Sequence, residues 1–247
     1  TSTPKSTVTA APVVPKPVAG TPKPAPAKPK VYALDTIKTP VPNMANAEMV
    51  VMHGFSGEIT NTGMMVNDLK EGVWKKYHPS NCLARVEQYT KGILNGLVIT
   101  IGRNGNLESE ENYTDGKFNG VQTYYTFSGN IKKEETYVNG TLDGKRKLFY
   151  DNEKPQEETE YKMGVKTGLA KWFNQEGNCV IEYTYVNGSL NGPTTEVFAS
   201  GKVQREGQYK NDNETGEWKE YDEDGNLIKT INYKDGTIVK EVLLKKK

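Results

Sequence analysis

Apolar and polar residues recur along most of this chain with a period of 24 residues. Rows of tyrosines and of glycines both keep that step, with no insertion between members. A repeat this regular predicts an array of similar units, each of which buries its apolar side chains only against its neighbours. The tyrosines are Tyr89, Tyr113, Tyr137, Tyr161, Tyr185, Tyr209 and Tyr233. The glycines are Gly72, Gly96, Gly120, Gly144, Gly168, Gly192 and Gly216.

Two turn signals divide each unit into two short segments. If the tyrosine is counted as position 0, a glycine usually follows at position 3, often after Asn or Asp, as in Asn139 and Gly140. A second glycine lies near position 16 in most units. Asn-Gly and Asp-Gly pairs are typical of tight hairpin turns, and segments of about six to eight residues between turns suit strands. The sequence therefore predicts an all-β fold, an elongated array of antiparallel β-hairpins in a single curved meander sheet.

The alternation of apolar and polar residues assigns the two faces of this sheet. Positions 0, 12 and 18 are aromatic or aliphatic in nearly every unit, and all three are even. Because side chains alternate between faces along a strand, we predict that even positions form a core face and odd positions a more exposed face. Besides the tyrosines, the core face would carry Tyr77, Ile101, Tyr125, Phe149, Phe173, Val197 and Tyr221 at position 12, and Leu83, Leu107, Ile131, Pro155, Cys179, Val203 and Leu227 at position 18.

The odd positions supply the candidate partner-binding residues. Aromatic residues at positions 9, 11 and 13 are interpreted either as hot spots for a partner or as cross-strand packing. They are Trp74, Tyr124, Tyr150, Trp172, Phe198 and Trp218. A row of glutamates at position 21 is interpreted either as a solvated charged face, with lysines interleaved, or as a stripe that binds a cation or a basic partner. They are Glu110, Glu134, Glu158, Glu182 and Glu206.

The two ends of the chain depart from the repeat. Residues 1–43 hold ten of the thirteen prolines, with six lysines against one aspartate. This composition predicts an extended proline-rich arm, either a linker or a peptide that docks on a partner. Residues 44–64 are interpreted as an incomplete entry unit, residues 65–232 as seven full units, and residues 233–247 as a capping half-unit.

The composition argues against several classes of function. The 32 basic and 31 acidic residues give a net charge of +1, which does not indicate a nucleic-acid partner. No apolar run reaches the roughly 20 residues of a membrane span. Two cysteines, Cys82 and Cys179, lie four units apart and are predicted to be unpaired. With two histidines, and neither a phosphate-binding loop nor a metal-ligand motif, the sequence predicts no catalytic residue, no cofactor and no metal site.

The repeated unit resembles a known family of repeats. The stretch from Tyr137 to Glu153, YVNGTLDGKRKLFYDNE, is similar to the MORN-repeat variant found in bacterial proteins labelled YwqK-type antitoxin components. The shared pattern is Tyr-x-x-Gly-x-x-x-Gly followed by an aromatic residue and an Asp/Asn-Gly turn, and it covers about residues 65–239. The resemblance implies a curved array of hairpins that acts as a protein-binding or membrane-associated scaffold. It brings no catalytic residues with it.

We therefore predict a non-catalytic scaffold subunit of a larger bacterial assembly, which binds one or more proteins through the open sheet face and the arm. The predicted location is the cell envelope, in the periplasm or at the outer membrane after removal of a signal segment. An attachment through partners or an upstream lipid anchor would suit this location, and a cytoplasmic location stays open. One alternative is a cytoplasmic antitoxin-type regulatory binder. A weaker alternative is a glycan or peptidoglycan-binding module that stacks sugar rings on exposed Trp74, Trp172 and Trp218.

Overall fold

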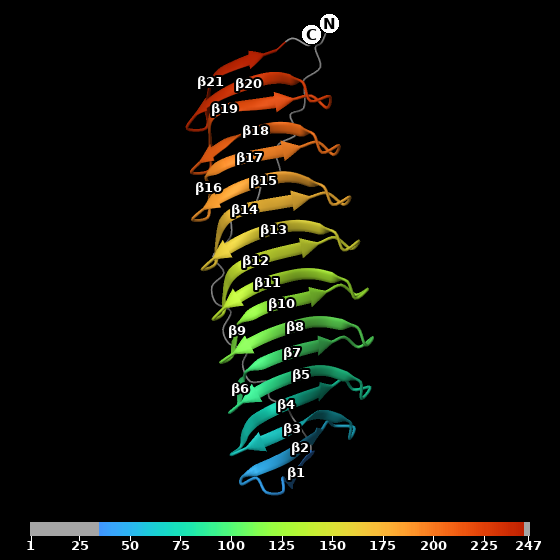
Figure 1. Ribbon diagram of the computed structural model, residues 1–247. Coiled ribbons are helices and arrows are strands. Elements are labelled where there is room, and N and C mark those ends of the chain that lie inside the picture. Colours follow the sequence, from blue (N-terminus) through green and yellow to red (C-terminus); the bar gives the residue numbers. More distant parts are fainter. Residues whose placement is uncertain (1–34, 245–247) are drawn as a thin grey trace. The chain divides into compact units, whose positions relative to one another are not determined.

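A computed structural model describes residues 35–244 of the protein, and this part of the chain contains strands and turns but no helix. Twenty-one antiparallel strands, β1 to β21, form one open sheet (Figure 1). Consequently, nothing in this range is a helix long and apolar enough to cross a membrane. The prediction of an all-β array of antiparallel hairpins is confirmed.

The strands follow the repeat of the sequence. Those before the first full unit are β1 (Asp35–Pro40), β2 (Ala47–His53) and β3 (Ile59–Val66). Those of the next units are β4 (Leu69–Tyr77), β5 (Leu83–Thr90), β6 (Ile93–Leu94), β7 (Gly96–Ile101), β8 (Leu107–Thr114), β9 (Lys117–Phe118), β10 (Gly120–Tyr125), β11 (Ile131–Val138) and β12 (Thr141–Phe149). The remainder are β13 (Pro155–Lys162), β14 (Val165–Phe173), β15 (Cys179–Val186), β16 (Ser189–Leu190), β17 (Gly192–Val197), β18 (Val203–Lys210), β19 (Asn213–Tyr221), β20 (Leu227–Lys234) and β21 (Thr237–Leu243).

A two-residue turn at positions 2 and 3 connects the strand that runs across the boundary between two units to the next strand of the second unit. At one such turn, Val138 lies opposite Thr141 in the pairing of β11 with β12. The glycine of this turn also contacts the preceding unit, because the amide of Gly140 donates a hydrogen bond of 2.8 Å to the carbonyl of Phe118. The same bond recurs between the other units, for example from Gly164 to Leu142. Each unit is therefore held to the one before it by its turn as well as by its strands.

The glycine row lies within the strands rather than in the turns. Each glycine of the row is directly opposite a tyrosine, as Gly144 in β12 is opposite Tyr161 in β13. Gly144 has a φ of +129°, and a Cβ atom placed on it would lie 2.9 Å from Cβ of Thr136. An L-residue with a side chain would be strained by this backbone conformation and crowded by that neighbour. The row thus marks a local irregularity at which only glycine fits well.

The tyrosine row shares its face with odd positions of the neighbouring strand. Because the turn at positions 2 and 3 has two residues, an even position on one strand lies opposite an odd position on the next, as Tyr137 (position 0) lies opposite Leu142 (position 5). Across the longer turn the pairing is again even with odd, and Ile231 (position 22) lies opposite Trp218 (position 9). The rings of Trp218 and Tyr209 lie 5.1 Å apart. We call this face, which carries positions 0, 9, 11, 20 and 22, the comb face.

The other two apolar rows lie on the opposite face. A register shift follows Tyr124, so that Tyr124 lies opposite Lys133 whereas Tyr125 lies opposite Ile131. The hydroxyl group of Tyr125 donates a hydrogen bond of 2.9 Å to Oε2 of Glu110, which places positions 12 and 21 together. We call this face, which carries positions 10, 12, 18 and 21, the stripe face. The prediction that positions 0, 12 and 18 share one face is wrong, because the two-residue turns and the register shifts change which positions face the same side.

The most buried side chains form a row across the comb face at positions 9 and 22. Trp74 and Trp218, predicted on the exposed face, are only 1% and 0% exposed. Each indole lies against the backbone of a glycine on the adjacent strand, and a Cβ atom on Gly63 or Gly207 would approach Cδ2 of the ring within 2.3 or 2.1 Å. Both tryptophans are buried because these two glycines leave room for them. Other buried members of the row are Glu87, Val98, Gln122, Glu135, Thr159, Ala170, Thr194 and Ile231.

The edges of the sheet change one predicted boundary. β1 lies within the segment predicted to be an arm, so the predicted limit at residue 43 is too far along the chain. Its β-branched residues, such as Ile37, suit a strand, and it ends at Pro40, which has no amide donor. At the other edge of the described sheet, β21 is paired with β20. The rest of the predicted arm, residues 1–34, and the end of the predicted cap, residues 245–247, lie outside the described residues.

Candidate functional site

A continuous apolar stripe crosses the stripe face of all seven full units. In each unit it consists of one residue at position 12 and the residue directly opposite at position 18, where the register shifts. All of these side chains are half-buried. Because residues 35–244 form a single sheet, no second layer from this part of the chain covers them. The pairs are Tyr77 and Leu83, Ile101 and Leu107, Tyr125 and Ile131, Phe149 and Pro155, Phe173 and Cys179, Val197 and Val203, and Tyr221 and Leu227.

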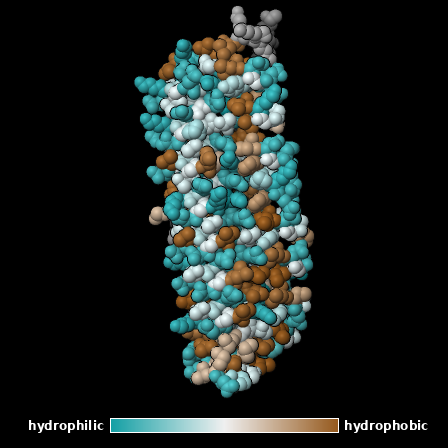
Figure 2. Space-filling model, viewed as in Figure 1, coloured by the Kyte–Doolittle hydropathy of each residue, from teal (hydrophilic) through white to brown (hydrophobic). Residues whose placement is uncertain are grey.

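The stripe widens at its N-terminal end. Position 21 is Val86 in β5, where later units carry glutamate, and it lies opposite Ile99 in β7. Together with Leu83, Ile101 and Leu107 these residues form an aliphatic patch, and Figure 2 shows hydrophobic side chains gathered over β5, β7 and β8. At this end the stripe therefore gains a further apolar pair, Val86 and Ile99.

The predicted glutamate row runs beside the stripe, and lysines interleave with its C-terminal part. Glu158 lies opposite Lys147 on one side and Lys171 on the other. Nζ of Lys171 is 2.7 Å from Oε1 of Glu182, and a further lysine approaches Glu206. Within residues 35–244, by contrast, no basic group lies within 4.0 Å of Glu110, Glu134 or Glu158. The middle of the row therefore keeps carboxylates that a basic partner could pair with.

Two tyrosines link the stripe to the glutamate row. Tyr125 donates to Glu110, and Tyr221 donates to Oε1 of Glu206 at 2.7 Å. Burial and the hydrogen bond to Glu110 raise the pKa of Tyr125 to about 12. The hydrogen bond to Glu206 and, to a smaller extent, burial raise the pKa of Tyr221 to about 12. Both phenols stay protonated at neutral pH, and these hydrogen bonds fix the orientation of their rings within the stripe.

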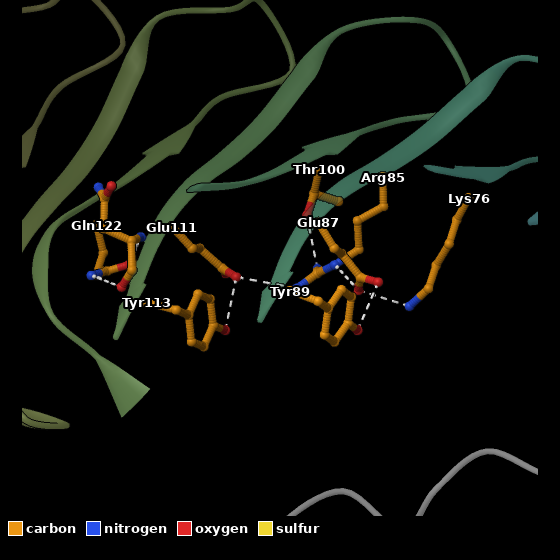
Figure 3. A network of polar contacts seen from close by, with 9 residues as sticks. Lys76, Arg85, Glu87, Tyr89, Thr100, Glu111, Tyr113 and Gln122 are labelled. Atoms are coloured by element: carbon orange, nitrogen blue, oxygen red, sulfur yellow. Dashed lines mark hydrogen bonds and ion pairs between the residues drawn. The ribbon is translucent and has the colours of Figure 1, made fainter. Parts of the chain in front are cut away.

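The comb face holds a network of charged groups that the sequence analysis missed. Glu87 is 3% exposed, and its carboxylate accepts hydrogen bonds from Lys76 at 2.8 Å, Arg85 at 3.0 Å and Tyr89 at 3.0 Å (Figure 3). Burial by itself would raise the pKa of Glu87, but the hydrogen bond and charge of Lys76 outweigh it and lower the pKa below its ordinary value. Glu87 is therefore a buried carboxylate that stays ionised because it is fully paired.

The same arrangement continues into the next units. Arg85 extends to Oγ1 of Thr100 at 2.9 Å and to Oε2 of Glu111 at 3.4 Å, and the hydroxyl of Tyr113 donates to Glu111 at 3.2 Å (Figure 3). Tyr137 donates in the same way to Glu135. The signal in the sequence is Glu-x-Tyr, with glutamate at position 22, in three successive units. Because these groups satisfy one another, we interpret the network as part of the folded core and place the candidate site on the stripe face.

The predicted partner-binding residues do not form one surface. The glutamates lie on the stripe face, whereas Trp74, Tyr124, Trp172 and Trp218 lie on the comb face. Tyr124 lies under Nζ of Lys133, 4.2 Å from the ring centre, and Trp172 packs edge-on against Tyr183 at 5.5 Å. These contacts are the cross-strand packing that was the alternative interpretation of the aromatic residues.

The aromatic residues at position 13 lie at the turns. The hydroxyl of Tyr150 donates 2.7 Å to the carbonyl of Phe173 in the next unit, so this tyrosine links two units. Nε2 of His78 lies 3.0 Å from the carbonyl of Ile101 in the same way. Phe198, the other predicted residue at this position, is half-buried.

The cysteines and the acidic groups show no metal site in the described part of the chain. Cys82 and Cys179 are both free, as predicted, with Cys82 exposed at a turn and Cys179 in the stripe. Burial raises the pKa of the Cys179 thiol, which keeps it protonated. No cluster of three or more histidine, cysteine, aspartate or glutamate residues within residues 35–244 could hold a metal ion.

Comparison with known proteins bears out one part of the family resemblance. A family model described as "MORN repeat variant" matches residues 118–139, 142–163, 190–211 and 214–235. No curated protein matches the sequence. One solved structure that resembles the chain is a porin-like protein from Bacteroides uniformis, with 9% sequence identity over 84% of this chain and 92% of that chain, and a TM-score of 0.21. A TM-score this low does not indicate a shared fold. The YwqK-type label is not supported by these comparisons and stays a prediction.

Proposed function

We propose, from the premise that this chain carries MORN-repeat variants in residues 118–235, that it is a non-catalytic scaffold that binds a partner protein along its stripe face. MORN repeats suggest a repeat-based binding module. The finer proposal is a subunit of a larger bacterial assembly in the cell envelope, with the proline-rich N-terminal segment as a second contact.

The observation that carries this proposal is the uncovered stripe. Equivalent residues of successive units are about 9.6 Å apart, because each unit contributes two strands at a spacing of about 4.8 Å. Seven units therefore give an apolar row about 58 Å long, bordered by acidic side chains. An apolar centre with a polar border is the usual composition of a protein interface, and a row of this length can supply the roughly 800 Å² per partner of a standard one.

The comb face supports the proposal less well. Its charged groups are already engaged with one another, so a partner would have to break those contacts before forming its own. Trp74 and Trp218 are buried there, which removes two of the three tryptophans needed by the glycan-binding alternative. Within residues 35–244, no feature favours the antitoxin-type alternative over a scaffold.

The experiment that tests the proposal compares the two faces directly. Tyr124 and Leu148 on the comb face are each followed in the chain by a stripe residue, Tyr125 or Phe149, and all four are half-buried. We would replace Tyr125 and Phe149 by serine in one variant, and Tyr124 and Leu148 by serine in the matched control. Each variant would be used, in parallel with the intact protein, to isolate partners from the native cells under mild detergent.

We expect the stripe variant to lose partners that the control retains, provided that both keep the circular-dichroism spectrum of a β-sheet. Recovery of the same partners by both variants would contradict the proposal. A third protein without residues 1–34 measures the contribution of the N-terminal segment. The deletion stops there because β1 begins at Asp35.

A further inference from the structure

Resting on the proposed function, we propose that the stripe face binds a proline-rich, lysine-bearing segment of the partner protein in the polyproline II conformation. The segment would cross the strands and place one helical turn on each unit.

The spacing of the units fits this conformation. Three residues of a polyproline II helix advance about 9.3 Å, against about 9.6 Å between units. The difference of about 0.3 Å accumulates to only about 1.5 Å over five units. Every third residue of such a segment would therefore meet the same row of the stripe.

Other peptide conformations fit less well. Two turns of an α-helix advance about 10.8 Å, so the helix would lose register by about 6 Å over five units. Two residues of an extended strand advance about 6.8 Å, which does not match one unit. The periodicity of the sheet thus selects polyproline II among the regular conformations.

The chemistry of the stripe also suits proline. Tyr125, Phe149 and Phe173 occupy position 12 in three successive units and are half-buried. Grooves lined by aromatic side chains are the usual docking sites of proline-rich segments, because the helix is already extended and loses little conformational entropy on binding. The aromatic rings lie one unit apart, so successive turns of the segment would each contact one ring.

The charge of the surface predicts lysine or arginine in the ligand. Residues 35–244 contain 24 lysines and arginines and 31 aspartates and glutamates, a net charge of −7. Glu110, Glu134 and Glu158, which have no basic group within 4.0 Å among these residues, lie beside the aromatic rings in successive units. Basic side chains three or six residues apart on the peptide would reach these carboxylates.

A peptide with this composition occurs in the chain itself and serves as the probe. Residues 11–30, APVVPKPVAGTPKPAPAKPK, contain seven prolines and four lysines and no acidic residue. We would titrate the full-length protein and, in parallel, the protein without residues 1–34 into the fluorescently labelled peptide, because the full-length chain carries its own competing copy of this segment. The anisotropy would be followed at low ionic strength and again at about 0.5 M salt. A second peptide, with every proline replaced by alanine and the lysines unchanged, tests the requirement for the polyproline II conformation.

We expect saturable binding that weakens in high salt, and at least tenfold weaker binding of the proline-free peptide. The substitution Glu134→Gln should weaken binding at least threefold without affecting folding, since its carboxylate forms no ion pair within the described residues. The Tyr125→Ser and Phe149→Ser variant should weaken it at least tenfold, and the comb-face control, Tyr124→Ser with Leu148→Ser, should leave it unchanged.

Equal binding of the two peptides would overturn the inference, because charge alone would then explain the interaction. Absence of binding to the protein without residues 1–34, or equal losses from the two faces, would overturn it as well. These outcomes are separable from the proposed function. If partners isolated from native cells depend on the stripe while the proline-rich peptide does not bind, the scaffold proposal stands and the ligand class is wrong.

Discussion

Substitution of Gly207 by alanine should destabilise the C-terminal units because it displaces a buried tryptophan. A Cβ atom on Gly207 would lie 2.1 Å from Cδ2 of Trp218, and two further ring atoms are within 2.6 Å. The φ of Gly207 lies outside the left-handed region, so the new methyl group adds no backbone strain and acts through the contact alone. The indole is fully buried, with Arg205 over its face at 4.0 Å and Tyr209 at 5.1 Å.

The size of the effect can be bounded from these contacts. A tryptophan buries about 150–250 Å², which at about 25 cal/mol per Å² corresponds to about 4–6 kcal/mol if the ring leaves its site completely. Overpacking that is relieved by small shifts costs about 1–3 kcal/mol. We expect a loss of about 2–4 kcal/mol in the free energy of unfolding, measured by urea denaturation with circular dichroism and with comparison of m-values, since repeat arrays can unfold in parts.

Two controls isolate the contact. Gly201, at a turn, has a φ of +84° and open space around its Cα, so Gly201→Ala reports the cost of backbone strain without a clash. A double-mutant cycle with Trp218→Ala measures the coupling, because Gly207→Ala should cost little once the indole is absent. A loss below about 0.5 kcal/mol for Gly207→Ala, or an equal loss with and without Trp218, would refute the reasoning.

Three further predictions concern the glycine row and the charged groups. Gly144→Val should lower the free energy of unfolding by more than about 1 kcal/mol, because valine is strained at a φ of +129° and meets Thr136; an unchanged urea midpoint would contradict this. Glu87→Gln should cost about 2–3 kcal/mol at pH 7, because it leaves Lys76 and Arg85 without their shared carboxylate, and the cost should shrink as acid protonates Glu87 in the unchanged protein. Stability should also fall between about pH 10 and 12, because four tyrosines of the comb face ionise near pH 10 in the unfolded chain but only at higher pH in the folded sheet. Phenolate absorbance that rises fully near pH 10 while the sheet is intact would argue against this. Burial raises the pKa to about 12 for Tyr124, Tyr137, Tyr185 and Tyr209.

The sequence predicted the hairpin array correctly because its signals are local. Asn139 and Gly140 specify a tight turn whatever surrounds them, and the period of 24 residues repeats that information in every unit. The assignment of faces failed because it depends on how strands pair. A two-residue turn puts even positions opposite odd ones, and the register shift after Tyr124 moves the position-18 row to the other face. Neither follows from alternation within a single strand.

The candidate site was predicted only in part for the same reason. The glutamate row and the apolar row at position 12 were both identified, but they were assigned to opposite faces, although Tyr125 and Glu110 are hydrogen-bonded. Trp74 and Trp218 were expected to be exposed because they occupy an odd position of the repeat. Gly63 and Gly207, which leave room for their rings, lie outside the glycine row, and their role is visible only from the neighbouring strand. The buried network could have been found from Glu-x-Tyr, which recurs in three successive units.

Because each unit contains both turns, the assignment of side chains to the two faces repeats every 24 residues. Whole units can therefore be added or removed without altering which face the other side chains occupy. Removal of residues 137–160 would join Thr136 to Tyr161 in the correct phase, and every remaining side chain would keep its face. The stripe would become shorter by about 9.6 Å. It would lose Phe149 and Pro155, and the glutamate row would lose Glu158. Insertion or deletion of a whole unit would therefore change the length of the partner segment that the surface can bind.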